Sequence, residues 1–216
     1  YRSRNNMLTK EHLERLMHPT GIDVSSLEFV QHSQNCVYRS CSAGESKIIR
    51  ISRDRYRTED EIEAELQWVN YLADAGIKVC RPIALDGKLF HALEIDGKIN
   101  IVTVFEHAPG EPMERGIANE ATFEKLGKLT GSMHAVASKY NREGGALLSR
   151  PLWKESRLLN QDIEMHKEAL GETVLSSVEN LIQSLTYIPK TATCFGILHA
   201  DINFVNLYQD GDDLWI

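Results

Sequence analysis

The sequence lacks the features of membrane-spanning and secreted proteins. Its apolar runs fall well short of the roughly 18 residues that cross a membrane, and its first residues carry no apolar stretch typical of a signal peptide. The cysteines show no CxxC spacing and no even framework, so we expect reduced thiols. These absences favour a cytoplasmic chain without membrane contact. The four cysteines are Cys36, Cys41, Cys80 and Cys194.

A basic excess is also missing, because 24 Lys and Arg residues stand against 31 Asp and Glu residues, for a net charge of −7. Proteins that bind nucleic acid over a broad surface are normally basic, so we expect no nucleic-acid partner. A local basic pocket on an acidic protein can still bind a small anion. The 216 residues, of which 42% are hydrophobic and 25% charged, are typical of a soluble globular chain of one large or two small domains.

Several catalytic motifs are absent as well. The chain has no GxxxxGK[ST] phosphate loop, which disfavours a Walker-type ATPase. It has no GxSxG elbow, so nothing supports a serine nucleophile. None of its eight histidines forms an HExxH motif or another cluster with metal-ligand spacing.

Hydrophobic patterning predicts a mixed lobe over residues 27–106. Thr58 followed by Glu61 is a helix-capping box, and Asp96-Gly97 between two apolar segments is a strong hairpin signal. The pattern predicts an antiparallel sheet with one long helix. The expected strands are 27–41 (interrupted near 32–35), 47–52, 79–84, 89–95 and 98–106, and the expected helices are 10–18 and 58–76.

Glu65 lies on the apolar stripe of that long helix. A carboxylate on a core-facing stripe is costly unless a basic group meets it, and the preceding strand offers Arg50 or Lys47. Alternation along a strand places these two cations on opposite faces, so only one of them can meet Glu65. From the residues alone, a Glu65 that reaches water is an equal alternative. The stripe consists of Ile62, Leu66, Val69 and Leu72.

The second half of the chain is expected to be mainly helical and to end in strands. A loop with Pro109, Gly110 and Pro112 breaks the pattern of the first half. The expected helices are 120–140, 154–170 and 173–185, and the expected strands are 194–198, 206–209 and 214–216.

A short loop between the last strands carries His199, Asp201 and Asn206. A carboxylate in such a loop can accept a proton, and an amide oxygen can bind a hard cation. Asp and Asn are also common turn formers, so the spacing alone leaves a purely structural role equally open.

His199-Ala200-Asp201 followed by Asn206 resembles the HxDxxxxN catalytic loop of the aminoglycoside phosphotransferase and choline kinase-like family, whose members are small-molecule kinases with a protein-kinase-like fold. Four further segments resemble family features in the same order, so the resemblance covers about residues 25–216. They are the nucleotide-covering hairpin at Asn35–Tyr38, the cationic strand at Lys47–Ile51, the helix glutamate Glu65, and the hinge between lobes at Phe105–Glu111.

The resemblance implies an α+β, protein-kinase-like fold of two lobes. A nucleotide-binding lobe of antiparallel sheet plus helix is implied for residues 1–107, and a mostly helical, incomplete catalytic lobe for residues 108–216. The implied reaction is phosphoryl transfer from ATP, with Mg²⁺, to a hydroxyl of a small-molecule acceptor. The acceptor class includes aminoglycosides, choline, homoserine and similar amino alcohols.

The resemblance also assigns roles to residues. Asp201 is implied to accept the proton of the acceptor hydroxyl, His199 to order the catalytic loop, and Asn206 to give an oxygen to Mg²⁺. The implied nucleotide contacts are Asn35 over the phosphates, Arg50 on the phosphates, Glu65 orienting that cation, and the backbone of Glu106 and Ala108 against adenine.

Three positions depart from the family pattern. Ala200 replaces the commoner Gly, and Arg50 stands where the family has Lys; we assign the phosphate role to Arg50 rather than Lys47 because it lies deeper in the apolar run. The family's metal-binding Asp follows the strand that 214–216 resembles, one residue past Ile216, so we expect residues 1–216 alone to be inactive. The alternative is a nucleotide-binding module without catalysis.

Overall fold

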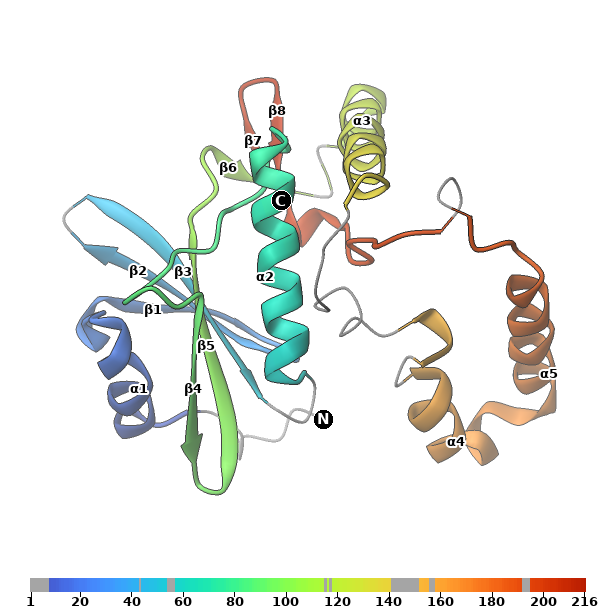
Figure 1. Cartoon of the computed structure of the whole chain (residues 1–216), viewed down its shortest axis with the longest axis horizontal. Helices are drawn as coiled ribbons and strands as arrows, with labels where there is room; N and C mark the ends of the chain where they lie inside the picture. Colours follow the sequence, from blue (N-terminus) through green and yellow to red (C-terminus); the bar gives the residue numbers. More distant parts are fainter. Residues whose placement is uncertain are drawn as a thin grey trace.

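Five segments of the N-terminal part form one antiparallel sheet in the computed structural model (Figure 1). The strand order is β1-β2-β3-β5-β4, which places β3 and β5 at the centre. The strands are β1 Leu27–His32, β2 Cys36–Ser42, β3 Glu45–Arg53, β4 Phe90–Ile95 and β5 Lys98–Glu106. The structure describes residues 8–42, 44–53, 57–114, 116, 118–140, 152–155, 158–191 and 195–216.

A different helix covers each face of this sheet. On one face Leu66 of helix α2 packs with Ile101 of β5, and on the other Leu16 of helix α1 packs with Ile49 of β3. Because side chains alternate along a strand, Arg50 lies on the α2 face. Helix α1 spans Lys10–Met17 and α2 spans Glu59–Asp74, and both begin with the capping boxes that their sequences contain.

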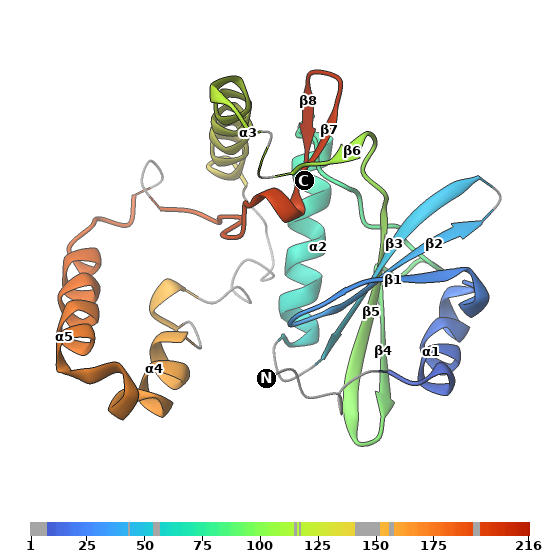
Figure 2. The same ribbon diagram turned by 180° about the vertical axis from the view of Figure 1, so that it is seen from behind.

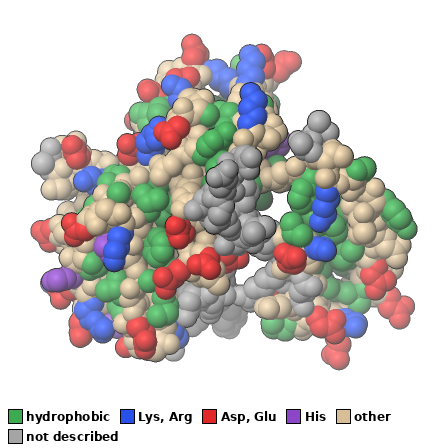
Figure 3. All heavy atoms as spheres, viewed as in Figure 1, with side chains coloured by type: hydrophobic (Ala, Val, Ile, Leu, Met, Phe, Trp, Pro, Cys, Tyr) green, Lys and Arg blue, Asp and Glu red, His purple; other side chains and the backbone are tan. Residues whose placement is uncertain are grey.

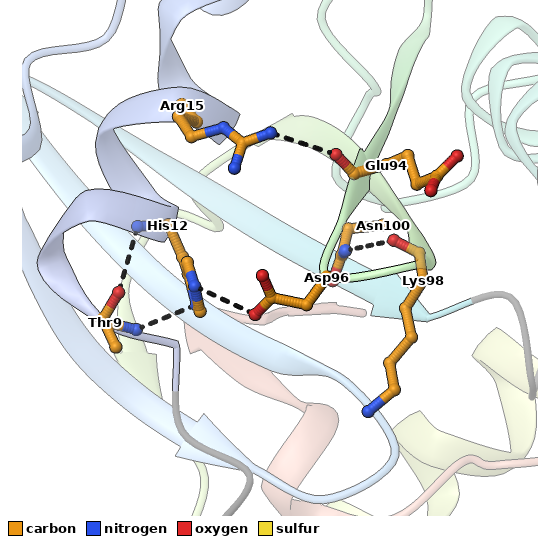
Figure 4. A network of polar contacts seen from close by, with 7 residues as sticks. All are labelled: Thr9, His12, Arg15, Glu94, Asp96, Lys98 and Asn100. Atoms are coloured by element: carbon orange, nitrogen blue, oxygen red, sulfur yellow. Dashed lines mark hydrogen bonds and ion pairs between the residues drawn. The ribbon is translucent and has the colours of Figure 1, made fainter.

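Polar contacts tie α1 to the hairpin of β4 and β5 (Figure 4). His12 Nε2 lies 3.3 Å from Asp96 Oδ2, and Arg15 Nη2 donates to the carbonyl of Glu94 at 3.3 Å. The turn residues Asp96 and Gly97 have φ values of 52° and 70°, as a type I′ turn requires. The hairpin predicted from Asp96-Gly97 is therefore confirmed.

The strand expected at 79–84 is wrong. This segment is extended but changes partner along its length, since Cys80 N donates to Ile216 O at 3.0 Å while Pro82 forms only an isolated bridge with Phe105. The pairing with β5 is limited to the hydrogen bonds on either side of this bridge, from Glu106 N to Arg81 O at 2.9 Å and from Ile83 N to Val104 O at 2.7 Å, and Leu85 then pairs with Lys88. The segment therefore lies in space between the end of β5 and the C-terminal residue Ile216, and it forms hydrogen bonds with both.

A second, three-stranded antiparallel sheet of order β6-β7-β8 follows the hinge. Directly after β6, Met113 N donates to Leu207 O at 2.8 Å and extends the pairing of β6 with β7. Leu207 and Leu214 belong to the same buried cluster as Met133 of helix α3 and Trp68 of α2, so α2 contacts both parts of the molecule. The bounds are β6 Glu111–Pro112, β7 Tyr208–Asp210, β8 Asp213–Trp215 and α3 Glu120–Ala137.

Helices α4 and α5 lie apart from the five-stranded sheet in both ribbon views (Figures 1 and 2). The helix expected at 173–185 is confirmed as the main part of α5, which Gly171 interrupts with φ 72° and ψ 163°. The helix expected at 154–170 is instead a series of short helical pieces in its described residues. Hydrophobic side chains are exposed on this part (Figure 3), among them Met165, Leu181 and Tyr187. The bounds are α4 Ile163–Met165 and α5 Lys167–Thr186, with a π-helical turn at Leu158–Asp162 and 3₁₀ turns at His18–Thr20, Val24–Ser26, Trp153–Glu155 and Phe204–Asn206.

The strand expected at 194–198 is also wrong for its described residues, 195–198, which form no strand ladder; residue 194 lies outside the described part. Leu198 is 55% exposed there. An apolar pattern specifies a strand only where a neighbouring strand supplies the ladder. Among the helices that the structure describes, none is long and apolar enough to cross a membrane.

Candidate active site

The carboxylate of Asp201 is held by two asparagine side chains of its own loop. Asn203 Nδ2 donates to Asp201 Oδ1 at 2.8 Å, and Asn206 Nδ2 donates to Asp201 Oδ2 at 3.1 Å. Asn206 Nδ2 also donates to the Asp201 carbonyl at 3.0 Å. Hydrogen bonds to a charged acceptor are among the stronger ones in proteins. The arrangement fixes an exposed carboxylate at the surface of the loop.

His199 orders the same loop from the other side. Its Nδ1 accepts a hydrogen bond from the backbone N–H of Asp201 at 3.3 Å. Burial lowers the pKa of His199 below its usual value, although the nearby Asp201 and Glu65 raise it in part. The lowered pKa favours the neutral ring, whose unprotonated Nδ1 can accept.

Ala200, between these two residues, has φ 63°. This left-handed conformation disfavours any residue with a Cβ and suits Gly. The sharp backbone turn at Ala200 gives a physical reason for Gly being commoner at this position in the family that the sequence resembles.

The cation of β3 meets the carboxylate of α2 as expected. Arg50 Nη1 lies 2.5 Å from Glu65 Oε1, and both side chains are about four-fifths buried, at 19% and 20% exposure. Lys47 Nζ instead lies 3.8 Å from Oε2 of Glu45 on the same strand. The strand therefore presents Arg50, not Lys47, to Glu65, as alternation requires.

The remaining donors of Arg50 make it suited to an anion. Its Nε and Nη2 atoms are buried and have no hydrogen-bond partner among the described residues. Its guanidinium carbon lies 5.1 Å from the ring centre of Phe105, within cation–π range. Buried N–H groups without partners are costly. A phosphate oxygen would satisfy them, so these residues fit a nucleotide polyphosphate.

A pocket of about 140 Å³ opens beside Phe105. Phe105–Ala108 form one wall and Asn206, at the end of the loop that carries Asp201, forms another, so segments far apart in sequence enclose one small apolar space. A flat aromatic base suits such a lining. The lining residues are Ile48, Cys80, Phe105, Glu106, His107, Ala108, Asn206, Tyr208 and Ile216.

The pocket and loop bring together most of the residues singled out from the sequence. Glu106, Ala108 and Asn206 line the pocket, and Glu65 is close enough to His199 to influence its pKa. Asn35 lies in the turn between β1 and β2 and is not part of this lining.

Sequence reasoning missed four residues of the site. The sequence pattern places Phe105 only in the hinge, Tyr208 only in a strand, and Cys80 only in a strand and among the reduced thiols. Asn203 was not singled out, although an Asn two residues after an Asp is a recognisable signal for a side-chain contact within a turn.

Known proteins are similar to this chain in sequence. Residues 31–216 match the phosphotransferase enzyme family. The chain is 28% identical over 192 residues to amicoumacin kinase of Bacillus subtilis (strain 168), a match covering 88% of this chain and 56% of that protein. It is 33% identical over 187 residues to the uncharacterized protein sll1119 of Synechocystis sp., covering 82% and 50%. The chain thus spans about half the length of these curated relatives.

Solved structures share the fold. Amicoumacin kinase hAmiN, in complex with AMP-PNP, Ca²⁺ and Ami, superposes with a TM-score of 0.85 at 24% identity, over 97% of this chain and 63% of that one. A microcompartment-associated aminopropanol kinase superposes with a TM-score of 0.74 at 22% identity, over 92% and 64%. The predicted α+β, kinase-like fold is confirmed by these matches. With residues 31–216 matched and the fold shared, the chain belongs to the phosphotransferase enzyme family.

Proposed function

We propose that the complete protein transfers the γ-phosphoryl group of ATP to a hydroxyl group of a small molecule. The observation that carries this proposal is the pairing of two features in one site. Arg50 offers two buried, unpartnered N–H groups, and a carboxylate, Asp201, is held by an asparagine that also lines the neighbouring pocket. The first suits a polyphosphate, and the second suits proton acceptance.

Nucleotide binding would use the pocket and the β3 cation. The adenine would lie against the hinge at Glu106 and Ala108, whose positions line the pocket. Arg50, oriented by Glu65 and by the Phe105 ring, would hold the phosphates. We place the boundary between the nucleotide-binding and catalytic lobes at residues 107 and 108, in this hinge.

The chemical step follows from the position of Asp201. The acceptor oxygen bonds to the γ-phosphorus of ATP while the bond from that phosphorus to the bridging oxygen breaks, and ADP leaves with the electron pair. The hydroxyl proton passes to the Asp201 carboxylate. Each oxygen of a carboxylate has two lone pairs, so the bonds from Asn203 and Asn206 leave a lone pair for the acceptor hydroxyl.

Mg²⁺, when bound, would neutralise charge on the phosphates. Asn206 is the residue of this chain suited to hold it, because its amide nitrogen is used on Asp201 and its amide oxygen is available to a hard cation. The hydrogen bond between the two residues links the orientation of that oxygen to the orientation of the Asp201 carboxylate.

The acceptor proposed is a small amino alcohol or an antibiotic that carries such a group. This proposal draws on the names of similar proteins, which are an amicoumacin kinase and, among solved structures, an aminopropanol kinase and a spectinomycin phosphotransferase. The net charge of −7 mildly favours a cationic acceptor.

The test uses the full-length protein with ATP, Mg²⁺ and a panel of amicoumacin A, spectinomycin, 1-amino-2-propanol, choline and homoserine. We expect acceptor-dependent ADP release with at least one of them. Asp201→Asn should lower kcat about 10²–10⁴-fold with nucleotide affinity retained. Asp210→Asn, the same change at the exposed last residue of β7, should leave kcat unchanged.

The substitution of Arg for the family's Lys at position 50 keeps one alternative open, a module that binds nucleotide without catalysis. Nucleotide binding in calorimetry, with no phosphoryl transfer to any acceptor of the panel, would support that alternative and reject the kinase. Absence of nucleotide binding by the folded protein at millimolar concentration would reject both.

A further inference from the structure

Asn203 makes two different contacts with the two ends of its side-chain amide. Its Oδ1 accepts from the backbone N–H of Val205 at 3.1 Å, which caps the 3₁₀ turn Phe204–Asn206. Its Nδ2 donates to Asp201 Oδ1 at 2.8 Å. The cap requires only the oxygen. The donor is therefore a separate feature, directed at the carboxylate to which the proposed function assigns the chemistry.

The second contact restricts a rotation that one contact leaves free. The terminal torsion of an Asp side chain has broad preferences, and Asn206 alone holds only the Oδ2 atom. With Asn203 on Oδ1, one amide donor reaches each oxygen, so the plane of the carboxylate is fixed. Reaction rates depend steeply on the alignment of such a group with the acceptor.

The same asparagine also couples the two partners of Asp201. By capping the turn that contains Asn206, Asn203 sets the backbone from which Asn206 reaches back to Asp201. Asp or Ser at this position could cap the turn but could not make the second contact, since Asp has no donor when ionised and Ser is too short to reach the carboxylate.

We propose that Asn203 is a positioning residue for the catalytic carboxylate of Asp201. This proposal rests on the proposed kinase function. Asn203 touches neither ATP nor acceptor in this proposal; it acts by holding Asp201 in the orientation in which a free lone pair faces the acceptor hydroxyl.

The experiment separates the cap from the positioning contact in the full-length protein. Asn203→Ser keeps a capping oxygen, because Ser and Asn cap helices about equally well, but it removes the donor to Asp201. We expect kcat to fall about 10-fold, with the KM for ATP and the melting temperature unchanged. Asn119→Ser is the matched control, since Asn119 caps α3 by the same kind of bond to Thr122 N and lies outside the catalytic loop; it should leave kcat unchanged.

A structural readout makes the test independent of turnover. In a crystal structure of Asn203→Ser we expect the Asp201 carboxylate in more than one orientation, with the Phe204–Asn206 turn intact. One fixed orientation as in the wild type, or a wild-type kcat, overturns the positioning role. Failure of the kinase proposal is distinguishable, because it shows as absent phosphoryl transfer in the wild type or as unchanged turnover in Asp201→Asn, whereas the orientation of Asp201 in the Ser variant still decides whether Asn203 fixes it.

Discussion

The guanidinium of Arg50 is held on two sides and free on the third. Glu65 pairs with Nη1, the Phe105 ring lies beside the guanidinium, and Nε and Nη2 have no partner among the described residues. The residues alone left a solvent-exposed Glu65 equally open, although a carboxylate on an apolar stripe is costly without a basic partner; the family resemblance favoured the pair with Arg50. The contact of Arg50 with the Phe105 ring could not be predicted, because it depends on the register in which β3 pairs with β5.

Neutralising Glu65 tests the importance of this pair. Glu65→Gln leaves the partly buried Arg50 without its counter-charge, so we expect a loss of about 1–3 kcal/mol in the free energy of unfolding and a roughly 3–10-fold weaker affinity for ATP. Glu63→Gln is the control, because Glu63 is exposed on the same helix and contacts Gln67. Calorimetry and urea unfolding measure both effects. Equal behaviour of the two variants would contradict the orienting role of Glu65.

Ala200 offers a second single-residue test. Its φ of 63° is strained for Ala, and Gly removes the strain at the expense of a more flexible unfolded chain. We expect Ala200→Gly to be neutral or to stabilise the protein by up to about 1 kcal/mol. The same change at the exposed helical residue Ala135 of α3 should destabilise it by about 0.5–1 kcal/mol. The shift in melting temperature of each variant shows whether its substitution stabilises or destabilises the protein.

At the scale of elements, sequence signals that act within a few residues predicted helices and hairpins correctly. Strands that depend on hydrogen bonds to distant segments were predicted less well. The capping box at Thr58 and the Asp96-Gly97 turn gave α2 and the β4–β5 hairpin, because both signals act within a few residues. The strands expected at 79–84 and 194–198 were wrong, because a strand exists only where a distant segment supplies hydrogen bonds.

Gly110 is where two elements come too close for a side chain. A Cβ there would lie 2.1 Å from Gln209 O of β7, and φ is +78°. We expect Gly110→Ala to cost about 2–5 kcal/mol, combining backbone strain with overpacking, and to weaken ATP binding by displacing the hinge from β7. Gly127→Ala in α3, where a Cβ meets nothing within 4 Å, should instead stabilise by about 0.5–1 kcal/mol. Urea unfolding of both variants is the measurement; a tolerated Gly110→Ala would contradict the close approach.

At the scale of the whole molecule, the site exists only when distant segments meet. The pocket combines Ile48 of β3, the hinge, Asn206 and Ile216, and helix α2 packs against both sheets through Leu66 and Trp68. The sequence identified the carboxylate, the amide and the cation of the site, because each of these groups is carried by only a few residue types. It could not give the pocket, because the distances depend on how the two sheets are placed about α2.

Burial in this assembled molecule also sets how its stability depends on pH. Burial raises the pKa of Cys80 to about 11 and raises those of Cys36 and Tyr38, so at alkaline pH the unfolded chain loses protons that the folded chain keeps. Burial lowers the pKa of His107 and His199, so below their ordinary value of 6.5 the unfolded chain gains protons that the folded chain refuses. Both effects oppose folding outside the neutral range.

The free energy of unfolding should therefore form a plateau between about pH 6.5 and 9 and fall on either side. For Cys80 the raised pKa means that its contribution is complete below about pH 9 and is lost as the pH approaches 11, a change of at most about 3 kcal/mol. Urea midpoints from pH 5 to 11 measure the curve. Cys80→Ser should flatten the alkaline limb, whereas Cys41→Ser, at an exposed thiol, should leave it unchanged. An alkaline limb that is the same in both variants would mean that the Cys80 thiol titrates as it does in water.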